Sequence, residues 1–242
     1  GLYLRRYGVD DQLVLLRGEA AVLRPGESRE LFWHIPDLDG QPVAEIGVEI
    51  ISEKRADGTL YLDYLTWDGE PDVRLSRPTE GGNMWRKAWV NAVDSYDPRW
   101  PEPYRLVQNR GSGLIMQGGR GWRNYQVEAT LIPHLVSSAG IAARVQGLER
   151  YYALLICADQ KIRLVKMLDG KQVLGEAPFT FKWDEAVRLK LEVDGTHLGA
   201  WANNVLLFGV EDVRAPFLEG GVALVVEEGQ ITCNEVRVSP AG

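Results

Sequence analysis

The chain has 242 residues, of which 45% are hydrophobic and 25% charged, and its formal net charge is −7. This composition is typical of a globular protein, and the length suits one large domain or two smaller ones. The negative charge argues against a nucleic-acid binder and gives no attraction to anionic membrane surfaces, and no apolar run is long enough for a membrane span. The chain begins GLYLRRYG, without Met or a signal-peptide pattern, so we expect Gly1 to be a cut with further sequence upstream.

The first part of the chain, over residues 1–75, contains strand-like segments separated by turn residues. These segments are QLVLLRGE, SRELFWHIP, VAEIGVEII and TLYLDYLTW. In the last of them apolar residues occur on both alternating faces, which is typical of a strand that is covered on one side and partly covered on the other. About seventy residues are few for a complete sandwich. We therefore predict an incomplete jelly-roll-like β domain over 1–75.

A break in the strand rhythm follows, and we interpret residues 76–84 as a linker because Pro, Gly and charged residues gather there. The next segment, WRKAWVNAVDSYD over 85–97, has apolar residues at helical spacing, but its context favours an entering strand. A second domain is expected over 85–242.

The second domain shows the clearest pattern in the chain, a series of short alternating strands closed by Asp-Gly, Gly-Gly and Asn-Asn turns. Alternation predicts that Ala142, Arg144 and Gln146 share one face of their strand. The hairpin over 187–208 is the strongest local prediction, with turns at Asp194-Gly195 and at Asn203-Asn204. The sequence therefore predicts an all-β protein with two antiparallel β-sandwich units.

Several sequence motifs of the second domain resemble those of a known group of folds. The strands AARVQ and YYALL, the LEVDG hairpin and the final EVRV strand are similar to concanavalin A-like, laminin-G-like sandwiches, which occur as accessory modules beside hydrolases. The pattern PDLDGQPVAEIGVEI…GTLYLDYLTWDG resembles the closing half of galactose-binding-like jelly rolls. The segment from WRKAWVNAV to GWRNYQVEA is similar to the region after the catalytic domain in some bacterial ADP-ribosylglycohydrolase-family proteins. That resemblance implies a non-catalytic part behind an upstream hydrolase domain, and it carries over neither a catalytic residue nor a magnesium ligand.

Candidate ligand-binding residues come from the polar faces of the predicted strands and from the tryptophans. Sugar-binding sandwiches stack aromatic rings on sugar rings and hydrogen-bond the hydroxyl groups with neighbouring polar side chains. We therefore predict that Arg144, Gln146, Tyr151 and Trp201 line one exposed sheet face that receives a carbohydrate. The alternative is a solvated face with scattered polar residues. Most of the other tryptophans are expected to pack in the core or between domains; they are Trp33, Trp67, Trp85, Trp89, Trp100, Trp122 and Trp183.

Residues for catalysis or metal binding are sparse. Glu227 and Glu228 are consecutive strand residues and should point to opposite faces, which does not suit the carboxylate pair of a glycosidase. The three histidines, His34, His134 and His197, are dispersed, so neither a Ser-His-Asp arrangement nor a zinc site is predicted. A structural calcium ion held by Asp94 and Asp97 is a minor alternative.

The two cysteines, Cys157 and Cys233, lie inside predicted strands and are expected to be buried, with a disulfide as the less favoured reading. Two free thiols favour a reducing, cytoplasmic compartment. Together these observations predict a non-catalytic accessory module that binds a carbohydrate or a glycan- or ADP-ribosyl-bearing substrate. The alternatives are a glycoside hydrolase with its site on the second sandwich, and a structural or oligomerisation module.

Overall fold

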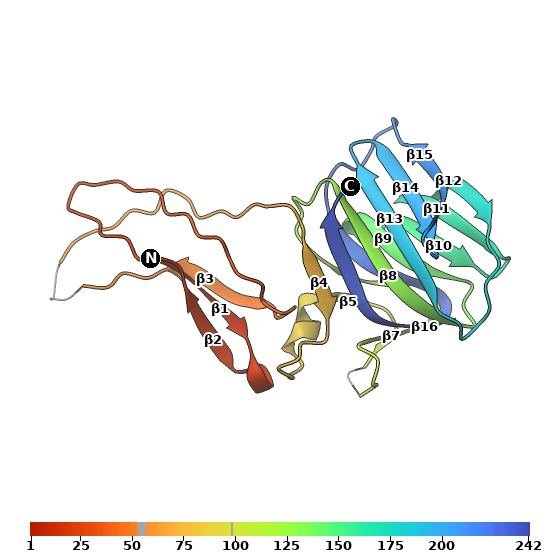
Figure 1. Cartoon of the computed structure of the whole chain (residues 1–242), viewed down its shortest axis with the longest axis horizontal. Coiled ribbons are helices and arrows are strands. Elements are labelled where there is room, and N and C mark those ends of the chain that lie inside the picture. Colours follow the sequence, from red (N-terminus) through yellow and green to blue (C-terminus); the bar gives the residue numbers. More distant parts are fainter. Residues whose placement is uncertain (53–56, 98) are drawn as a thin grey trace. The chain divides into compact units, whose positions relative to one another are not determined.

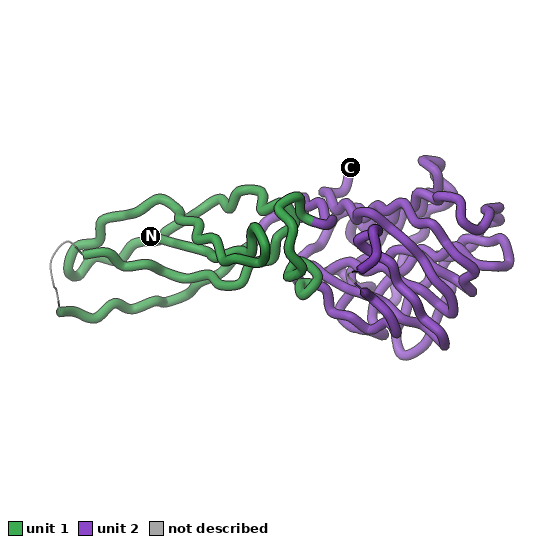
Figure 2. The backbone as a smooth tube through the Cα atoms, turned by 90° about the horizontal axis from the view of Figure 1, so that it is seen from below, with its two compact units in different colours: residues 1–68, 78–88 green, residues 69–77, 89–242 purple. Residues whose placement is uncertain are grey.

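The computed structural model describes residues 1–52, 57–97 and 99–242. The chain forms two compact units, which are coloured separately in Figure 2. Unit 1 contains residues 1–68 and 78–88, and unit 2 contains residues 69–77 and 89–242. The chain therefore enters unit 2, returns to unit 1 and enters unit 2 again, where a single linker over 76–84 was expected. The first entry occurs because the strand over 73–76 pairs with the last strand of unit 2.

Unit 1 is built around one small antiparallel sheet. Its elements are β1 (Leu2–Tyr7), η1 (Val9–Asp11), β2 (Leu13–Arg17), β3 (Val43–Val48) and η2 (Met84–Ala88), where η marks a 3-10 helix. The sheet has the order β2-β1-β3, and Leu4 in the central strand is fully buried. Side chains connect the returning segment to this sheet, because Arg6 forms an ion pair with Glu80 at 2.7 Å and Asp11 accepts the N–H of Asn83 at 2.8 Å.

The jelly-roll expectation for the first part of the chain is not met by the described residues. Two of its four predicted strands, over 28–36 and 59–67, form no ladder in the described part of the unit. Large apolar side chains in and near these segments are exposed, among them Phe32 at 87%, Tyr61 at 85% and Trp67 at 72%. Alternation in a sequence reports which faces are apolar, but it does not supply a strand with which to pair.

Unit 2 consists almost entirely of antiparallel strands. In chain order they are β4 (Val73–Ser76), β5 (Val90–Ala92), β6 (Ser95–Tyr96), β7 (Tyr104–Gln117), β8 (Tyr125–His134), β9 (Ser138–Gly147), β10 (Arg150–Cys157), β11 (Lys161–Leu168), β12 (Lys171–Pro178), β13 (Val187–Asp194), β14 (His197–Ala202), β15 (Val205–Glu211) and β16 (Gly221–Pro240).

These strands form two layers that share β16 and β7 (Figure 1). We call the layer with β7, β16, β8, β13, β14 and β15 sheet A, and the layer with β7, β16, β9, β10, β11 and β12 sheet B. The first half of β16 pairs with β9 and its second half with β8, so this one strand passes from sheet B to sheet A. The expectation of an all-β protein with an antiparallel sandwich in the second domain is confirmed.

The bend of β16 occurs at Glu228 and Gly229, which both have positive φ angles, of 46° and 150°. A Cβ atom on Gly229 would lie 2.2 Å from the carbonyl oxygen of Leu135, so this position requires glycine. The register of β16 against β7 shifts at the same place. A bulge therefore turns the strand from one layer to the other.

The core lies between the two layers. From sheet A it receives Leu189, Leu191 and Leu198, and from sheet B it receives Leu154 and Leu164, and all five are at most 1% exposed. The hairpin predicted over 187–208 is present as β13 and β14, and both residues of the Asn203-Asn204 turn have positive φ, as expected.

The segment over 85–97 combines both of the structures that its sequence allowed. Its first residues belong to η2, and the strands β5 and β6 follow. The preferred interpretation as a strand is therefore correct only for its second half.

Candidate functional site

The four predicted ligand-binding residues do not share one face. Trp201 lies on β14 in sheet A, whereas Arg144, Gln146 and Tyr151 lie on β9 and β10 in sheet B. Arg144 is fully buried and Tyr151 is 1% exposed, so neither can line an exposed surface. The structure therefore corrects the prediction of one shared, exposed face.

Arg144 is buried because β9 contains a bulge that alternation does not reveal. The residue has a φ of 49°, and the register of β9 against β16 shifts beside it. Its guanidinium donates to the carbonyl oxygens of Gly195 and Phe217, both at 2.6 Å, and its own N–H donates to the hydroxyl of Tyr125 at 2.6 Å. Burial lowers the pKa of Arg144 and raises that of Tyr125. Arg144 thus has a structural role, in which it satisfies backbone carbonyls inside the sandwich.

Tyr151 and Gln146 also make local contacts in sheet B. The ring of Tyr151 belongs to a buried cluster with the small residues Ala142, Ala153 and Ala223, and burial raises the pKa of its phenol. The amide of Gln146 is exposed, donates to the carbonyl oxygen of Glu219 at 2.8 Å and accepts from Arg150 at 2.7 Å.

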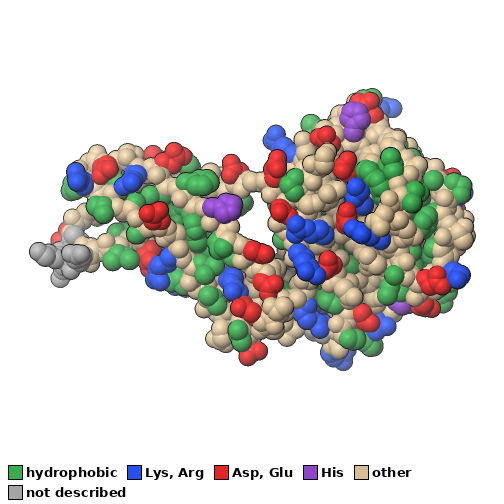
Figure 3. Space-filling view, viewed as in Figure 1, with side chains coloured by type: hydrophobic (Ala, Val, Ile, Leu, Met, Phe, Trp, Pro, Cys, Tyr) green, Lys and Arg blue, Asp and Glu red, His purple; other side chains and the backbone are tan. Residues whose placement is uncertain are grey.

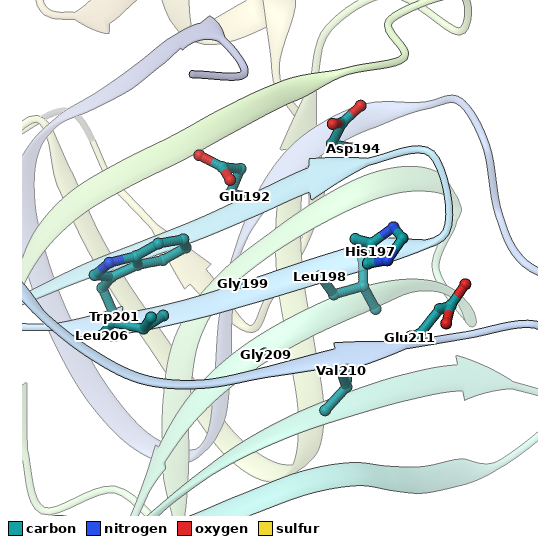
Figure 4. A pocket seen from close by; sticks show the side chains of 10 residues that line it. All are labelled: Glu192, Asp194, His197, Leu198, Gly199, Trp201, Leu206, Gly209, Val210 and Glu211. Atoms are coloured by element: carbon teal, nitrogen blue, oxygen red, sulfur yellow. The ribbon is translucent and has the colours of Figure 1, made fainter.

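Trp201 is placed differently, beside a shallow hollow of about 420 Å³ on the outer face of sheet A (Figure 4). Gly199 and Gly209 lie opposite each other on β14 and β15 and form the floor of this hollow. A Cβ atom on Gly199 would lie 2.4 Å from the indole ring, so the absence of a side chain allows the ring to lie over the backbone. The volume is near the lower end of the range for small-ligand sites.

Polar side chains surround this floor, and most of them form no hydrogen bond with the described protein groups. Glu192 is paired with Gly199 across the strands, and Asp194 is paired with His197 at the hairpin end. Within the described residues, the side chains of these three polar residues take part in no hydrogen bond or ion pair. Glu211 accepts a hydrogen bond from Thr196 at 3.0 Å and can accept more. An aromatic ring beside several unpaired polar groups is the arrangement that binds a polyhydroxylated ligand.

The indole ring has one charged neighbour. The ammonium nitrogen of Lys190 lies 3.8 Å from the centre of the Trp201 ring, within the range of a cation–π interaction. No hydrogen bond or ion pair holds the Lys190 ammonium in the described part of the chain.

The rest of the face seen in Figure 3 differs from the hollow, because charged side chains of both signs gather there. Several of them form ion pairs with each other. Examples are the pair Arg188–Glu128 between β13 and β8 and the pair Arg74–Glu235 between β4 and β16.

A second hollow, of about 430 Å³, lies on the outer face of sheet B. Its floor is apolar and includes Leu155 and Val165. Its charged groups are engaged with each other, because Glu227 pairs with Lys171 and accepts from Ser138. The carboxylate of Glu227 is thus already bound by protein groups. We therefore consider this hollow a weaker candidate for ligand binding than the one at Trp201.

One histidine does meet an acid and a hydroxyl group. The Nδ1 atom of His134 contacts the carboxylate of Asp184, and its Nε2 atom lies 3.3 Å from Oγ1 of Thr232. This order of groups is that of a Ser-His-Asp triad with threonine in place of serine. Thr232 is only 4% exposed, so a substrate has no access to its hydroxyl. The sequence analysis missed this contact because the three residues are far apart along the chain.

The two residues considered for a structural calcium ion, Asp94 and Asp97, bind other protein groups. Asp94 accepts from the backbone and side chain of Asn109, and Asp97 pairs with Arg99. In residues 1–52, 57–97 and 99–242, no group of three or more His, Cys, Asp or Glu side chains could hold a metal ion.

The two cysteines, Cys157 and Cys233, are both buried and free, as the preferred interpretation expected.

Among the described helices, none has the length and apolar character needed to cross a bilayer.

Comparisons with known proteins show the fold of unit 2. No protein-family model matches the chain, and no curated protein matches its sequence. Among solved structures, the carbohydrate-binding module CBM66 from Bacillus subtilis superposes with a TM-score of 0.57 at 16% identity, covering 63% of this chain and 95% of that module. A Bacillus subtilis protein of unknown function with a galectin-like fold superposes with a TM-score of 0.54 at 13% identity, covering 72% of this chain and 97% of that protein.

At these identities the likeness concerns the fold alone. It confirms the concanavalin A-like part of the fold prediction, and nothing in these comparisons supports the link to ADP-ribosylglycohydrolases. The larger unit of this chain is therefore a galectin-like, concanavalin A-like β-sandwich similar in fold to a carbohydrate-binding module.

Proposed function

We propose that this protein is a non-catalytic carbohydrate-binding module whose ligand lies in the hollow beside Trp201. The observation that carries the proposal is the combination of an accessible indole ring with unpaired polar groups. Glu192, Asp194 and His197 border the hollow and have no hydrogen-bond or ion-pair partner in the part of the chain that the structure describes. Unpaired groups of this kind can accept and donate hydrogen bonds to sugar hydroxyls at no cost in existing protein contacts.

Two further observations support the proposal. The Trp201 ring covers Gly199, but no side chain covers Gly209, so the floor beside the indole is open to a flat sugar ring. The similarity in fold to CBM66 adds an analogy, which by itself assigns no ligand. The predicted residue Trp201 thus keeps its proposed role, whereas Glu192, Asp194 and His197 replace Arg144, Gln146 and Tyr151 in the proposed site.

The test is calorimetric titration of the full chain with a panel of neutral, acidic and amino-group-bearing oligosaccharides. We expect one class to bind, and Trp201→Ala to weaken its Kd by about 30-fold, since truncating a central tryptophan costs about 2 kcal/mol. The matched control is Trp100→Ala. Trp100, like Trp201, has a cation above its ring, because the Arg105 guanidinium lies 4.1 Å from the ring centre, but Trp100 is outside the hollow and is 45% exposed, whereas Trp201 is half-buried.

Two results would contradict this proposal. One is a failure of every glycan to bind, and the other is a bound glycan whose affinity is unaffected by Trp201→Ala. Release of reducing sugar from the bound oligosaccharide would instead favour the glycoside hydrolase alternative. The attachment of the module to an upstream hydrolase domain stays a prediction of the sequence resemblance.

A further inference from the structure

A cation from the protein itself lies on the Trp201 ring at the border of the hollow. The Lys190 ammonium lies 3.8 Å from the centre of the indole ring, although Glu192 is two residues away on the same face of the same strand. Lys190 has no ion pair within the described residues. The ring is therefore the partner that this ammonium takes in the structure, which indicates that the Trp201 ring at the border of the hollow accommodates a positive charge.

The remaining charges of the hollow favour the same kind of ligand. Three carboxylates line it, those of Glu192, Asp194 and Glu211, and no arginine or lysine belongs to the described residues that line it. Neither Glu192 nor Asp194 forms an ion pair in the described chain, although Asp194 lies near enough to the buried Arg144 guanidinium to oppose in part the lowering of that group's pKa by burial. A uronic acid or a sulfated sugar would meet an excess of negative charge here, whereas an ammonium group would be attracted to both the ring and the carboxylates.

We propose that the ligand is a glycan that carries free amino groups, of the glucosamine type, and that Lys190 occupies the place of a ligand ammonium until the glycan displaces it. This inference rests on the proposed carbohydrate-binding function and adds its ligand class. In the bound state the ligand ammonium replaces that of Lys190 over the indole of Trp201, and the sugar ring extends from there along the hollow toward Glu192 and Asp194. Lys190 is then a specificity-determining residue, because its own charge competes with that of the ligand.

The experiment compares two probes of equal length, a glucosamine oligosaccharide and its fully N-acetylated counterpart, by calorimetric titration of the full chain. The probes differ in charge at each amino group and share the same sugar skeleton. We expect the free-amine form to bind about tenfold more tightly at low salt, because exposed cation–π contacts and ion pairs are each weak but act together here. The preference should decrease as salt screens the charges.

Two variants test the assigned residues. Glu192→Gln removes one carboxylate without changing the shape of the side chain and should reduce the preference several-fold. Lys190→Met should strengthen binding of the free-amine probe, because it removes the competing charge and leaves the indole accessible. The matched control is Glu235→Gln, which makes the same charge change on sheet A outside the hollow and should have no effect on the preference.

The outcomes separate this inference from the function on which it rests. Equal or tighter binding of the N-acetylated probe would overturn the ligand class and leave the carbohydrate-binding proposal in place. Equal effects of Glu192→Gln and Glu235→Gln would overturn the assignment to this hollow. Binding of an oligolysine peptide as tight as that of the glucosamine probe would show recognition of ammonium groups on a peptide and overturn the glycan class. Failure of the whole glycan panel would refute the proposed function itself.

Discussion

The buried ion pair between Lys166 and Asp212 leads to a specific prediction about the stability of unit 2. Asp212 follows β15, and its carboxylate lies 2.6 Å from the Lys166 ammonium and accepts from the hydroxyl of Tyr152, also at 2.6 Å. Lys166 is 3% exposed and Asp212 is 7% exposed. The pair joins β11 of sheet B to the segment that leaves sheet A.

Replacing Asp212 with alanine leaves the Lys166 ammonium buried without a carboxylate. Loss of one partner from a buried pair costs about 3–5 kcal/mol. We expect the lower end, about 3 kcal/mol, because the ammonium also donates to the carbonyl oxygens of Arg214 at 2.8 Å and Ala215 at 2.7 Å, which remain. For a domain of this size, that loss corresponds to a decrease in Tm of about 6–12 °C.

Urea and thermal unfolding followed by circular dichroism measure this loss. The control is Glu185→Ala, which removes one partner of the exposed pair Lys182–Glu185 and should cost about 1 kcal/mol or less. The double variant Lys166→Met with Asp212→Ala should recover most of the stability, since it leaves no buried charge. A cost for Asp212→Ala that is as small as that of the control would refute the reasoning.

The pH dependence of the same pair gives a second measurement. Burial by itself would raise the pKa of Asp212, but hydrogen bonds from Lys166 and Tyr152 outweigh it and hold the pKa below its ordinary value of 3.8. A carboxylate with a lowered pKa stabilises the folded state above its unfolded pKa and loses that contribution as the pH falls. The difference in unfolding free energy between wild type and Asp212→Ala should thus be constant down to about pH 4 and shrink below it.

Two other predictions concern buried side chains of unit 2. Arg144→Met should reduce the free energy of unfolding by about 3 kcal/mol, because it leaves buried backbone carbonyls without donors. Glycan affinity should not change, and a stable variant with lost binding would contradict the structural role of Arg144. Cys157 and Cys233 should not react with a thiol reagent at pH 8 in the folded protein, because burial raises the pKa of both thiols, that of Cys233 to about 12. Both should react in denaturant without reductant, and fast labelling of the native chain would contradict their burial.

The comparison between sequence and structure is most instructive at β9 and β14. In both strands, period-2 alternation predicted which side chains leave the core. The prediction was correct for Trp201, because β14 pairs with β13 without a shift from His197 to Ala202, and the extra residue at the shift against β15 belongs to β15. It was wrong for Arg144, because one extra residue in a bulge moves every later side chain of the strand to the other face.

The candidate site could be predicted only in part for a similar reason. Trp201 and Glu192 share a hairpin, so alternation placed them on one face. Glu211 and Gly209 come from β15, and their contribution to the hollow depends on the register of the next hairpin. The composition of a site that spans three strands follows from these registers rather than from the spacing of residues in any one strand.

By itself, the sequence determined the antiparallel strands of unit 2, the turns that join them and the apolar face of each hairpin, because these depend on local periodicity and on turn residues. Only the tertiary structure decided that β16 bends from one sheet into the other, that Arg144 is enclosed and that the expected jelly roll is a three-stranded sheet in the described residues of unit 1. These features depend on pairing between distant segments, and pairing is set by backbone hydrogen bonds that carry no residue-specific signal.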